Sequence, residues 1–209
     1  MHTEVAKVIV QHRRDWIETP DALGFSPLHI AVQNNDCHLI TALIGAGAQI
    51  EATTEDGATP LLLAADMGHV EAAGTLLNEG AQLVHKDKEG WQAIQWAAQI
   101  GHLEMVEYLF SKAVASISVD EIKANDGTTP MHCAAEVGHL HVLKFLIKNG
   151  FKAAAMNEER KTPKMLARKN GYNTVVKALI KAGDNENDAN GSVTNSRGNK
   201  QRKTTHIHT

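Results

Sequence analysis

Histidine and cysteine are the residues of this sequence whose side chains could do the most chemistry. The 209-residue chain contains 12 histidines and two cysteines, Cys37 and Cys133. Together such side chains could ligate zinc or form a nucleophile and its base, but either use requires them to converge on one point. Their spacing along the chain therefore decides between a chemical and a structural role.

The histidines recur along the sequence instead of clustering. Three of them, at intervals of 33 and 37 residues, follow a glycine, and two others follow a proline and one apolar residue; these are His69, His102 and His139, then His29 and His132. Residues one repeat apart lie one structural unit apart and cannot share an ion. His139 and His141 are two residues apart, which on a helix places them on different faces. We expect no metal site and no cofactor.

Neither the positions of the cysteines nor any known catalytic motif in the sequence indicates an enzyme. Cys37 and Cys133 occupy apolar positions in units that are not neighbours, so a disulfide is not expected. Two reduced cysteines are typical of a cytoplasmic or nuclear protein. The sequence contains no phosphate-binding glycine loop, no Gly-x-Ser-x-Gly and no His-Glu-x-x-His. We therefore expect a non-enzymatic protein.

Composition excludes several further classes of protein. The formal net charge is −3, without the basic excess of a nucleic-acid-binding protein. No apolar run reaches the length of about 18 residues needed for a membrane span, and no secretory signal is visible at the N-terminus. The hydrophobic fraction of 43% is ample for a packed core.

Two independent markers show that the sequence is built from repeats. The first is a proline, replaced once by alanine, and the second is a glycine, replaced once by asparagine. Both series advance by 33, 33, 37 and 33 residues, at Pro27, Pro60, Ala93, Pro130 and Pro163 and at Asn35, Gly68, Gly101, Gly138 and Gly171. A repeat of this length indicates units that stack side by side.

Each unit follows the same order of local signals. A glycine turn precedes Ser-Pro or Thr-Pro, which can cap a helix and begin it. An alanine-rich helix follows, predicted at 28–32, 61–65, 94–98 and 131–135, and Gly-His ends it. A second helix shows apolar residues at i, i+3 and i+4 and stops at a glycine such as Gly47, Gly80, Gly150 or Gly183.

Residues 57–71 (GATPLLLAADMGHVE) and 127–141 (GTTPMHCAAEVGHLH) resemble ankyrin repeats. The resemblance covers about residues 2–183 and implies an all-α solenoid of helix–turn–helix units with β-turn fingers on one side. It also implies that His29 and His132 hydrogen-bond neighbouring turns and hold the units in register. The repeats themselves predict that each unit buries its apolar face only against its neighbours.

The repeats divide the chain into seven segments. A partial unit (1–20) comes first, and five units and a polar tail follow at 21–53, 54–86, 87–123, 124–156, 157–183 and 184–209. The partial unit is either a cap or the start of a truncated or alternative form of a longer protein, and its unpartnered Val5, Val8 and Ile9 favour the second. The tail is expected to be disordered, with a basic cluster at 197–203 that is either solvated or a contact for import factors or acidic surfaces.

The third unit is irregular. It lacks Thr-Pro, has Gln95 where other units have histidine or leucine, and carries four extra residues within 113–120. An insertion of this kind is either a binding loop or neutral variation in a tolerant loop. The sequence favours neutral variation.

In the resembling family, partners most often lie in the concave groove between the finger tips and the exposed side of the first helices. The matching positions that we take as candidate protein-binding residues are Phe25, Gln33, Asn34, Asp66, Met67, Lys88, Trp91, Gln99, Ile100, Thr128, Glu136 and Val137. Trp91 is the strongest candidate because tryptophan is favoured at interaction hot spots, and the alternative is packing within the chain against the next finger or the 113–120 insertion. Trp96, in a leucine position, is expected in the core.

These observations predict a protein-binding module that acts as an adaptor, scaffold or inhibitor, monomeric by itself. Acidic residues in the candidate groove, among them Glu55, Asp66 and Glu136, favour a partner with apolar and basic character. The alternative is a built-in structural or regulatory subunit of a larger assembly, which the partial first unit and the irregular third unit favour. The identity of the partner does not follow from the fold.

Overall fold

Paired helices stacked in two layers make up the fold. The computed structural model describes residues 17–113 and 118–191, with side chains described up to residue 183. The first helices of the units are α2 (Pro27–Gln33), α4 (Pro60–Met67), α6 (Ala93–Ile100), α8 (Pro130–Val137) and α10 (Pro163–Lys169). The second helices are α3 (Cys37–Gly45), α5 (Val70–Asn78), α7 (Leu103–Ala113), α9 (Leu140–Lys148) and α11 (Asn173–Gly191). No strand occurs among the described residues, so the prediction of an all-α solenoid is confirmed.

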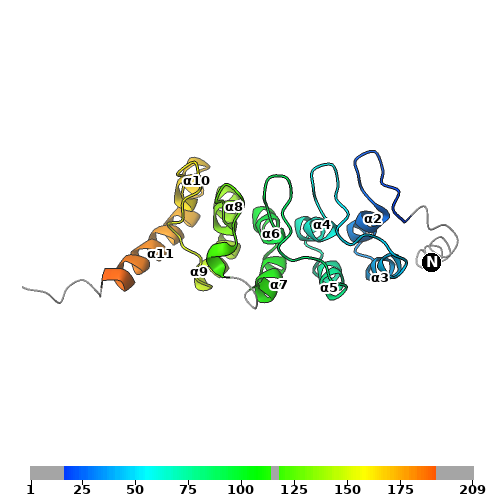
Figure 1. The fold of residues 1–209 in the computed structure, drawn as a ribbon. Helices are drawn as coiled ribbons and strands as arrows, with labels where there is room; N and C mark the ends of the chain where they lie inside the picture. Colours follow the sequence, from blue (N-terminus) through cyan, green and yellow to red (C-terminus); the bar gives the residue numbers. More distant parts are fainter. Residues whose placement is uncertain (1–16, 114–117, 192–209) are drawn as a thin grey trace, which may run out of the picture.

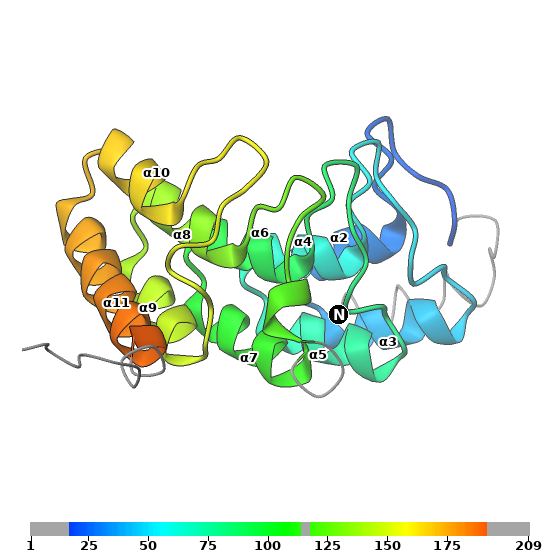
Figure 2. The ribbon, with the colours of Figure 1, turned by 60° about the vertical axis from the view of Figure 1, so that its left-hand side comes forward.

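The two layers and the fingers are seen directly in the ribbon. Each first helix packs against the first helix of the next unit, and each second helix does the same. Figure 1 shows the two rows of helices, with the loops that join the units projecting as fingers beyond the row of first helices. Figure 2 shows α11 lying beside α9 and α10 at the end of the stack.

The first helices begin and end where the repeated signals predict. Ser26 and Thr59 accept hydrogen bonds from backbone N–H groups in the first turns of α2 and α4, and proline stands at the first position. At the other end, Gly68, Gly101 and Gly138 adopt left-handed φ values of 72°, 93° and 92°. That conformation ends the helix and favours glycine. Gln92, which replaces Ser or Thr before α6, makes no side-chain cap bond.

Small residues line the interior between successive units. Alanines of α2, α4, α6 and α8 are fully buried, and larger residues of the second helices fill the layer behind them, including Leu76, Met105, Leu109 and Leu143. These residues form one continuous core along the stack. Each unit is therefore stabilised mainly by its immediate neighbours.

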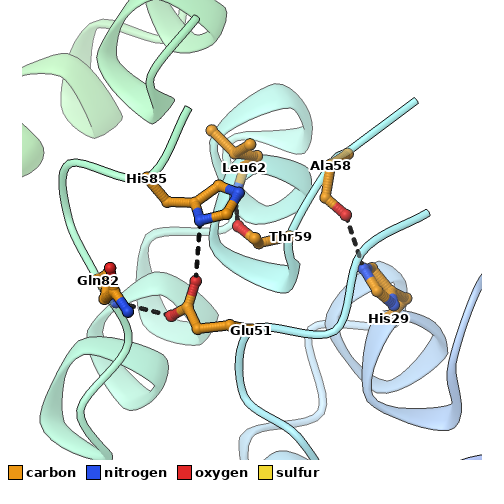
Figure 3. Close-up of polar contacts among 7 residues, drawn as sticks. All are labelled: His29, Glu51, Ala58, Thr59, Leu62, Gln82 and His85. Atoms are coloured by element: carbon orange, nitrogen blue, oxygen red, sulfur yellow. Dashed lines mark hydrogen bonds and ion pairs between the residues drawn. The ribbon is translucent and has the colours of Figure 1, made fainter. Parts of the chain in front are cut away.

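Polar contacts between units follow the same repeat. His29 donates from Nε2 to the carbonyl of Ala58 at 3.0 Å, and His132 donates to the carbonyl of Lys161 at 3.0 Å, as the resemblance implied. In the second unit Leu62 takes the place of His29 (Figure 3). Glu51 accepts a 2.8 Å hydrogen bond from the amide of Gln82 and lies 3.5 Å from Nδ1 of His85, which joins the first and second units (Figure 3).

The C-terminal end differs from the prediction. Gly183 was expected to stop the last helix, but it lies inside α11, which continues to Gly191. Gly183 does not adopt the left-handed conformation found at Gly47, Gly80 and Gly150, so nothing in the backbone ends the helix there. The helix therefore includes the first eight residues of the segment expected to be disordered.

Some predictions fall outside the described residues. These are the helix of the partial first unit, Trp16, residues 114–117 of the insertion, and residues 192–209 of the tail. Within the described part, Ile17 is buried, and Glu18 accepts a 2.8 Å hydrogen bond from the amide of Gln49. No described helix has the length and apolar character that crossing a bilayer would require.

Candidate functional site

One side of the first helices is exposed and apolar in the first three units. Counted from the first residue of each helix, positions four, seven and eight share a side, because residues three and four apart are neighbours on a helix. Because the units repeat, these sides line up along the stack. We call this surface, with the finger residues beside it, the inner face; it consists of Phe25, Ile30, Gln33, Asn34, Leu63, Asp66, Met67, Trp91, Trp96, Gln99 and Ile100.

Large apolar side chains are the main feature of the inner face. Ile30, Met67 and Ile100 expose 42%, 39% and 45% of their surface, and Leu63 and Trp96 are half-buried between them. In the fourth and fifth units, position four is buried, as Cys133 and Leu166. The exposed apolar surface therefore belongs to the first three units.

The two tryptophans of the third unit pack on each other. The ring centroids of Trp91 and Trp96 are 5.2 Å apart. The indole N–H of Trp96 donates to Oδ2 of Asp87 at 2.8 Å, while Oδ1 of Asp87 accepts from the backbone amide of Trp91 at 2.8 Å. Asp87 thereby holds the ring of Trp96 and the backbone of Trp91 to the finger of their own unit, and the Trp91 ring packs on Trp96.

The prediction that Trp96 lies in the core is wrong. Trp96 is half-buried because it repeats the positions of Ile30 and Leu63, which also lie on the inner face. Trp91 packs within the chain on Trp96 of its own unit, a partner that the sequence did not predict, and it remains half-buried. Position four of the first helices is not among the candidate binding residues predicted from the sequence. The sequence does show a large apolar residue at that position in three successive units, Ile30, Leu63 and Trp96.

Asp66 lies in the middle of the inner face, next to Met67. Its carboxylate forms no hydrogen bond or ion pair within the described residues, although its backbone carbonyl accepts from Nε2 of His102 at 2.9 Å. Burial raises the pKa of Asp66, and the nearby His102 offsets part of the shift. Burial disfavours the ionised form of a carboxylate, and a cation close to it favours that form.

The backbone beneath this surface is held from the next unit. The carbonyls of Gln33 and Gln99 accept hydrogen bonds from His69 and His139, at 3.2 and 3.0 Å, in the same way as Asp66. In the fourth unit the carbonyl of Glu136 accepts instead from Nδ2 of Asn170 at 2.6 Å. The last turn of the first helix is therefore anchored from the next unit in each of the first four units.

The remaining candidate binding residues differ in how much of their surface is exposed. Gln33, Asn34, Lys88 and Glu136 are exposed, and Phe25, Gln99 and Val137 are half-buried. Phe25 makes an edge contact with His29, with ring centroids 5.6 Å apart. Thr128 exposes only 9% of its surface, and its hydroxyl donates to Oδ2 of Asp126 at 2.8 Å, so it offers a partner little surface.

Among the described residues, His29, His69, His102, His132, His139 and His141 bind backbone carbonyls. The described residues include no cluster of three or more His, Cys, Asp or Glu side chains able to hold a metal. Cys37 and Cys133 are both free, and burial raises the pKa of the Cys133 thiol, which disfavours the nucleophilic thiolate.

One expectation about the histidines is wrong. The rings of His139 and His141 lie 5.9 Å apart and bind two carbonyls of the third unit, those of Gln99 and Gly101. His139 is the N-cap of α9, with φ −74° and ψ 77° outside the helical range, so helical spacing does not separate it from His141.

The insertion borders a hollow of about 270 Å³ on the third and fourth units, lined in part by Val119, Lys123, Phe151 and Met156. Lys152 bridges the two units by a 2.9 Å ion pair with Asp120. Residues 118–122 contain a short 3-10 helix, Val119–Glu121, whose start is capped by Ser118. Both interpretations of the insertion stay open.

These features define a helical solenoid, a class of protein whose stacked units present one long surface. A family model described as ankyrin repeats (3 copies) matches residues 28–120 and 113–190, and a second, ankyrin repeats (many copies), matches residues 2–44. The chain belongs to the ankyrin repeat family. Proteins of this family are typically non-enzymatic, and their repeats are generally protein–protein interaction modules. No curated protein matches the chain significantly.

Proposed function

We propose that this chain is a non-enzymatic adaptor, scaffold or inhibitor that binds a protein partner against its inner face. The observation that carries the proposal is the row of exposed Ile30, Met67 and Ile100 on three consecutive first helices. Clusters of exposed apolar side chains tend to mark interaction sites, and interface cores favour methionine and aromatic residues.

The rigidity of the inner face also supports this function. His69, His102 and His139 anchor the carbonyls below it, and Asp87 holds the tryptophan pair. A surface that is already ordered loses little conformational entropy when a partner binds. Less of the interaction free energy is then lost to ordering the surface, so the affinity is higher.

A pull-down from cell extract with a double variant, Met67→Ser with Ile100→Ser, tests the proposal. Loss of two exposed apolar contacts should reduce capture of the specific partner about tenfold or more. Ile180→Ser is the matched control, since Ile180 is 42% exposed on α11, away from the inner face. Circular dichroism of all three proteins should show the same helix content. Equal capture by the double variant and the native chain would sink the proposal.

We also propose that the chain works as a monomer in the cytoplasm or nucleus. The free thiols of Cys37 and Cys133 support a reducing compartment, because reduced cysteines persist there. Fluorescence of a tagged chain together with light scattering of the purified protein checks both statements. Secretion of the tagged chain, or a dimer mass, would contradict them.

A further inference from the structure

Charge is distributed very unevenly along the stack. Residues 17–85 contain nine aspartate or glutamate residues and no lysine or arginine. Residues 139–183 contain ten lysine or arginine residues and only two glutamates. These segments form opposite ends of the solenoid (Figure 1). The small net charge of the whole chain therefore conceals an acidic half and a basic end.

The exposed apolar part of the inner face lies mainly in the acidic half. Ile30 and Met67 belong to the first two units, and Ile100 lies in the next unit. Glu55, at the end of a finger in the second unit, is exposed, and Asp66 is half-buried beside Met67, where its carboxylate forms no hydrogen bond or salt bridge within the described residues. This combination is an apolar surface with an unpaired carboxylate inside it.

We infer that the inner face of the first three units binds a segment of another protein in which apolar side chains are flanked by lysine or arginine. The inference rests on the proposed function and specifies the partner's chemistry. The apolar side chains of the segment cover Ile30, Met67 and Ile100. One cation lies against Asp66, where it forms the charge-assisted hydrogen bond that this carboxylate lacks.

The field of the acidic half favours the same partner. The nine carboxylates of residues 17–85, a segment that itself contains no lysine or arginine, attract basic segments and repel nucleic acid and other polyanions. The tail of this chain is basic at Arg197, Lys200, Arg202 and Lys203, but residues 192–209 contain only two large apolar residues, Val193 and Ile207. It therefore has too few apolar side chains to cover the row of Ile30, Met67 and Ile100.

A phage-displayed library of random 16-residue peptides, panned against the full chain, provides the probe. Enriched peptides are synthesised, and their affinities are measured by fluorescence anisotropy at low and high sodium chloride concentration. We expect apolar residues with a net positive charge, and weaker binding at high salt. Asp66→Asn should weaken binding about tenfold and reduce its salt dependence, as expected for loss of a charged contact. Glu107→Gln, an exposed residue of α7, is the matched control and should leave binding unchanged.

The outcomes separate this inference from the proposed function. If Met67→Ser with Ile100→Ser abolishes binding but the enriched peptides are neutral or acidic, the partner chemistry is wrong and the binding face stands. If that double variant binds the enriched peptides normally, the binding face is wrong as well. Failure of the library to enrich any peptide overturns the inference, while the pull-down still tests the function. Displacement of the enriched peptides by a synthetic peptide of residues 192–209 would reassign the face to the tail and overturn the inference.

Discussion

Gln95 and His132 occupy the same place, the third residue of the first helix, with opposite consequences. Nδ1 of His132 accepts from the backbone amide of Thr129 at 3.2 Å, and Nε2 donates to the carbonyl of Lys161. Gln95 is fully buried, and neither its Oε1 nor its Nε2 has a hydrogen-bond partner. Leu62 fills the same place in the second unit.

Substitution of leucine at these two places should therefore have opposite effects. Gln95→Leu removes a buried amide without partners and should raise the free energy of unfolding by about 1–2 kcal/mol. His132→Leu leaves Thr129 and the carbonyl of Lys161 without their partner and should lower it by about 1–3 kcal/mol. Urea denaturation measures both values. A loss of stability in Gln95→Leu would contradict the description of this site.

The buried histidines also predict a dependence of stability on pH. Burial lowers the pKa of His29 and of His132 from the ordinary value of 6.5. Both donate from Nε2 and accept at Nδ1, so the neutral ring fits the folded chain. As the pH falls below 6.5, these two histidines become protonated in the unfolded chain before they do in the folded chain. Their contribution to the free energy of unfolding is therefore complete above pH 6.5 and is lost as the pH falls toward the lower pKa values of the folded chain.

Urea denaturation as a function of pH tests this linkage. The native chain should lose stability as the pH falls from about 7 through 6.5 and below. The double variant His29→Leu with His132→Leu should be less stable at pH 7 but should change less over the same range. An unchanged slope in the variant would show that other groups cause the loss.

At the scale of the element, each first helix ends where the next unit contacts it. Gly68 ends α4 with φ 72°, and a Cβ atom there would lie 2.8 Å from Nδ1 of His102. The ring of His102 cannot move away freely, because its Nε2 is bonded to the carbonyl of Asp66. Gly171 has a similar φ of 79°, but no atom lies within 4 Å of the place of its Cβ.

A pair of alanine substitutions separates backbone strain from the contact between units. Gly171→Ala should cost about 1 kcal/mol, from the left-handed conformation alone. Gly68→Ala should cost at least about 1 kcal/mol more, since it must also displace His102. Thermal unfolding of the two variants provides the comparison. Equal losses of stability would mean that the histidine ring is free to move.

Local signals in the sequence were sufficient to predict where the first helices begin and end. The features that they did not predict depend on contacts between parts of the chain that are farther apart in the sequence. Pro27, Thr59 and Gly68 act through the nearest turn of the chain, so a repeated pattern is enough to place the helix ends. The half-buried position of Trp96 depends on Asp87 and on the width of an alanine-lined interior. The extension of α11 past Gly183 has no equivalent in the other units from which it could be inferred.

At the scale of the whole molecule, the repeat produces a surface that no single unit contains. Units one to three contribute Ile30, Met67 and Ile100 to one row, whereas in the fourth unit Cys133 at position four is buried and Val137 at position eight is half-buried. The family resemblance directed attention to this side of the first helices. It did not identify position four of the first helices, because the exposure of that side chain depends on how each unit packs in this particular stack.

Photo-crosslinking from two positions of equal exposure tests the central claim most directly. A photoreactive amino acid replaces either Ile100 on the inner face or Ile180 on α11, which are 45% and 42% exposed. In cell extract, we expect position 100 to crosslink to a discrete protein that the double variant Met67→Ser with Ile100→Ser fails to capture, and we expect no crosslink to that protein from position 180. Crosslinking of that protein from position 180 and not from position 100 would contradict the account.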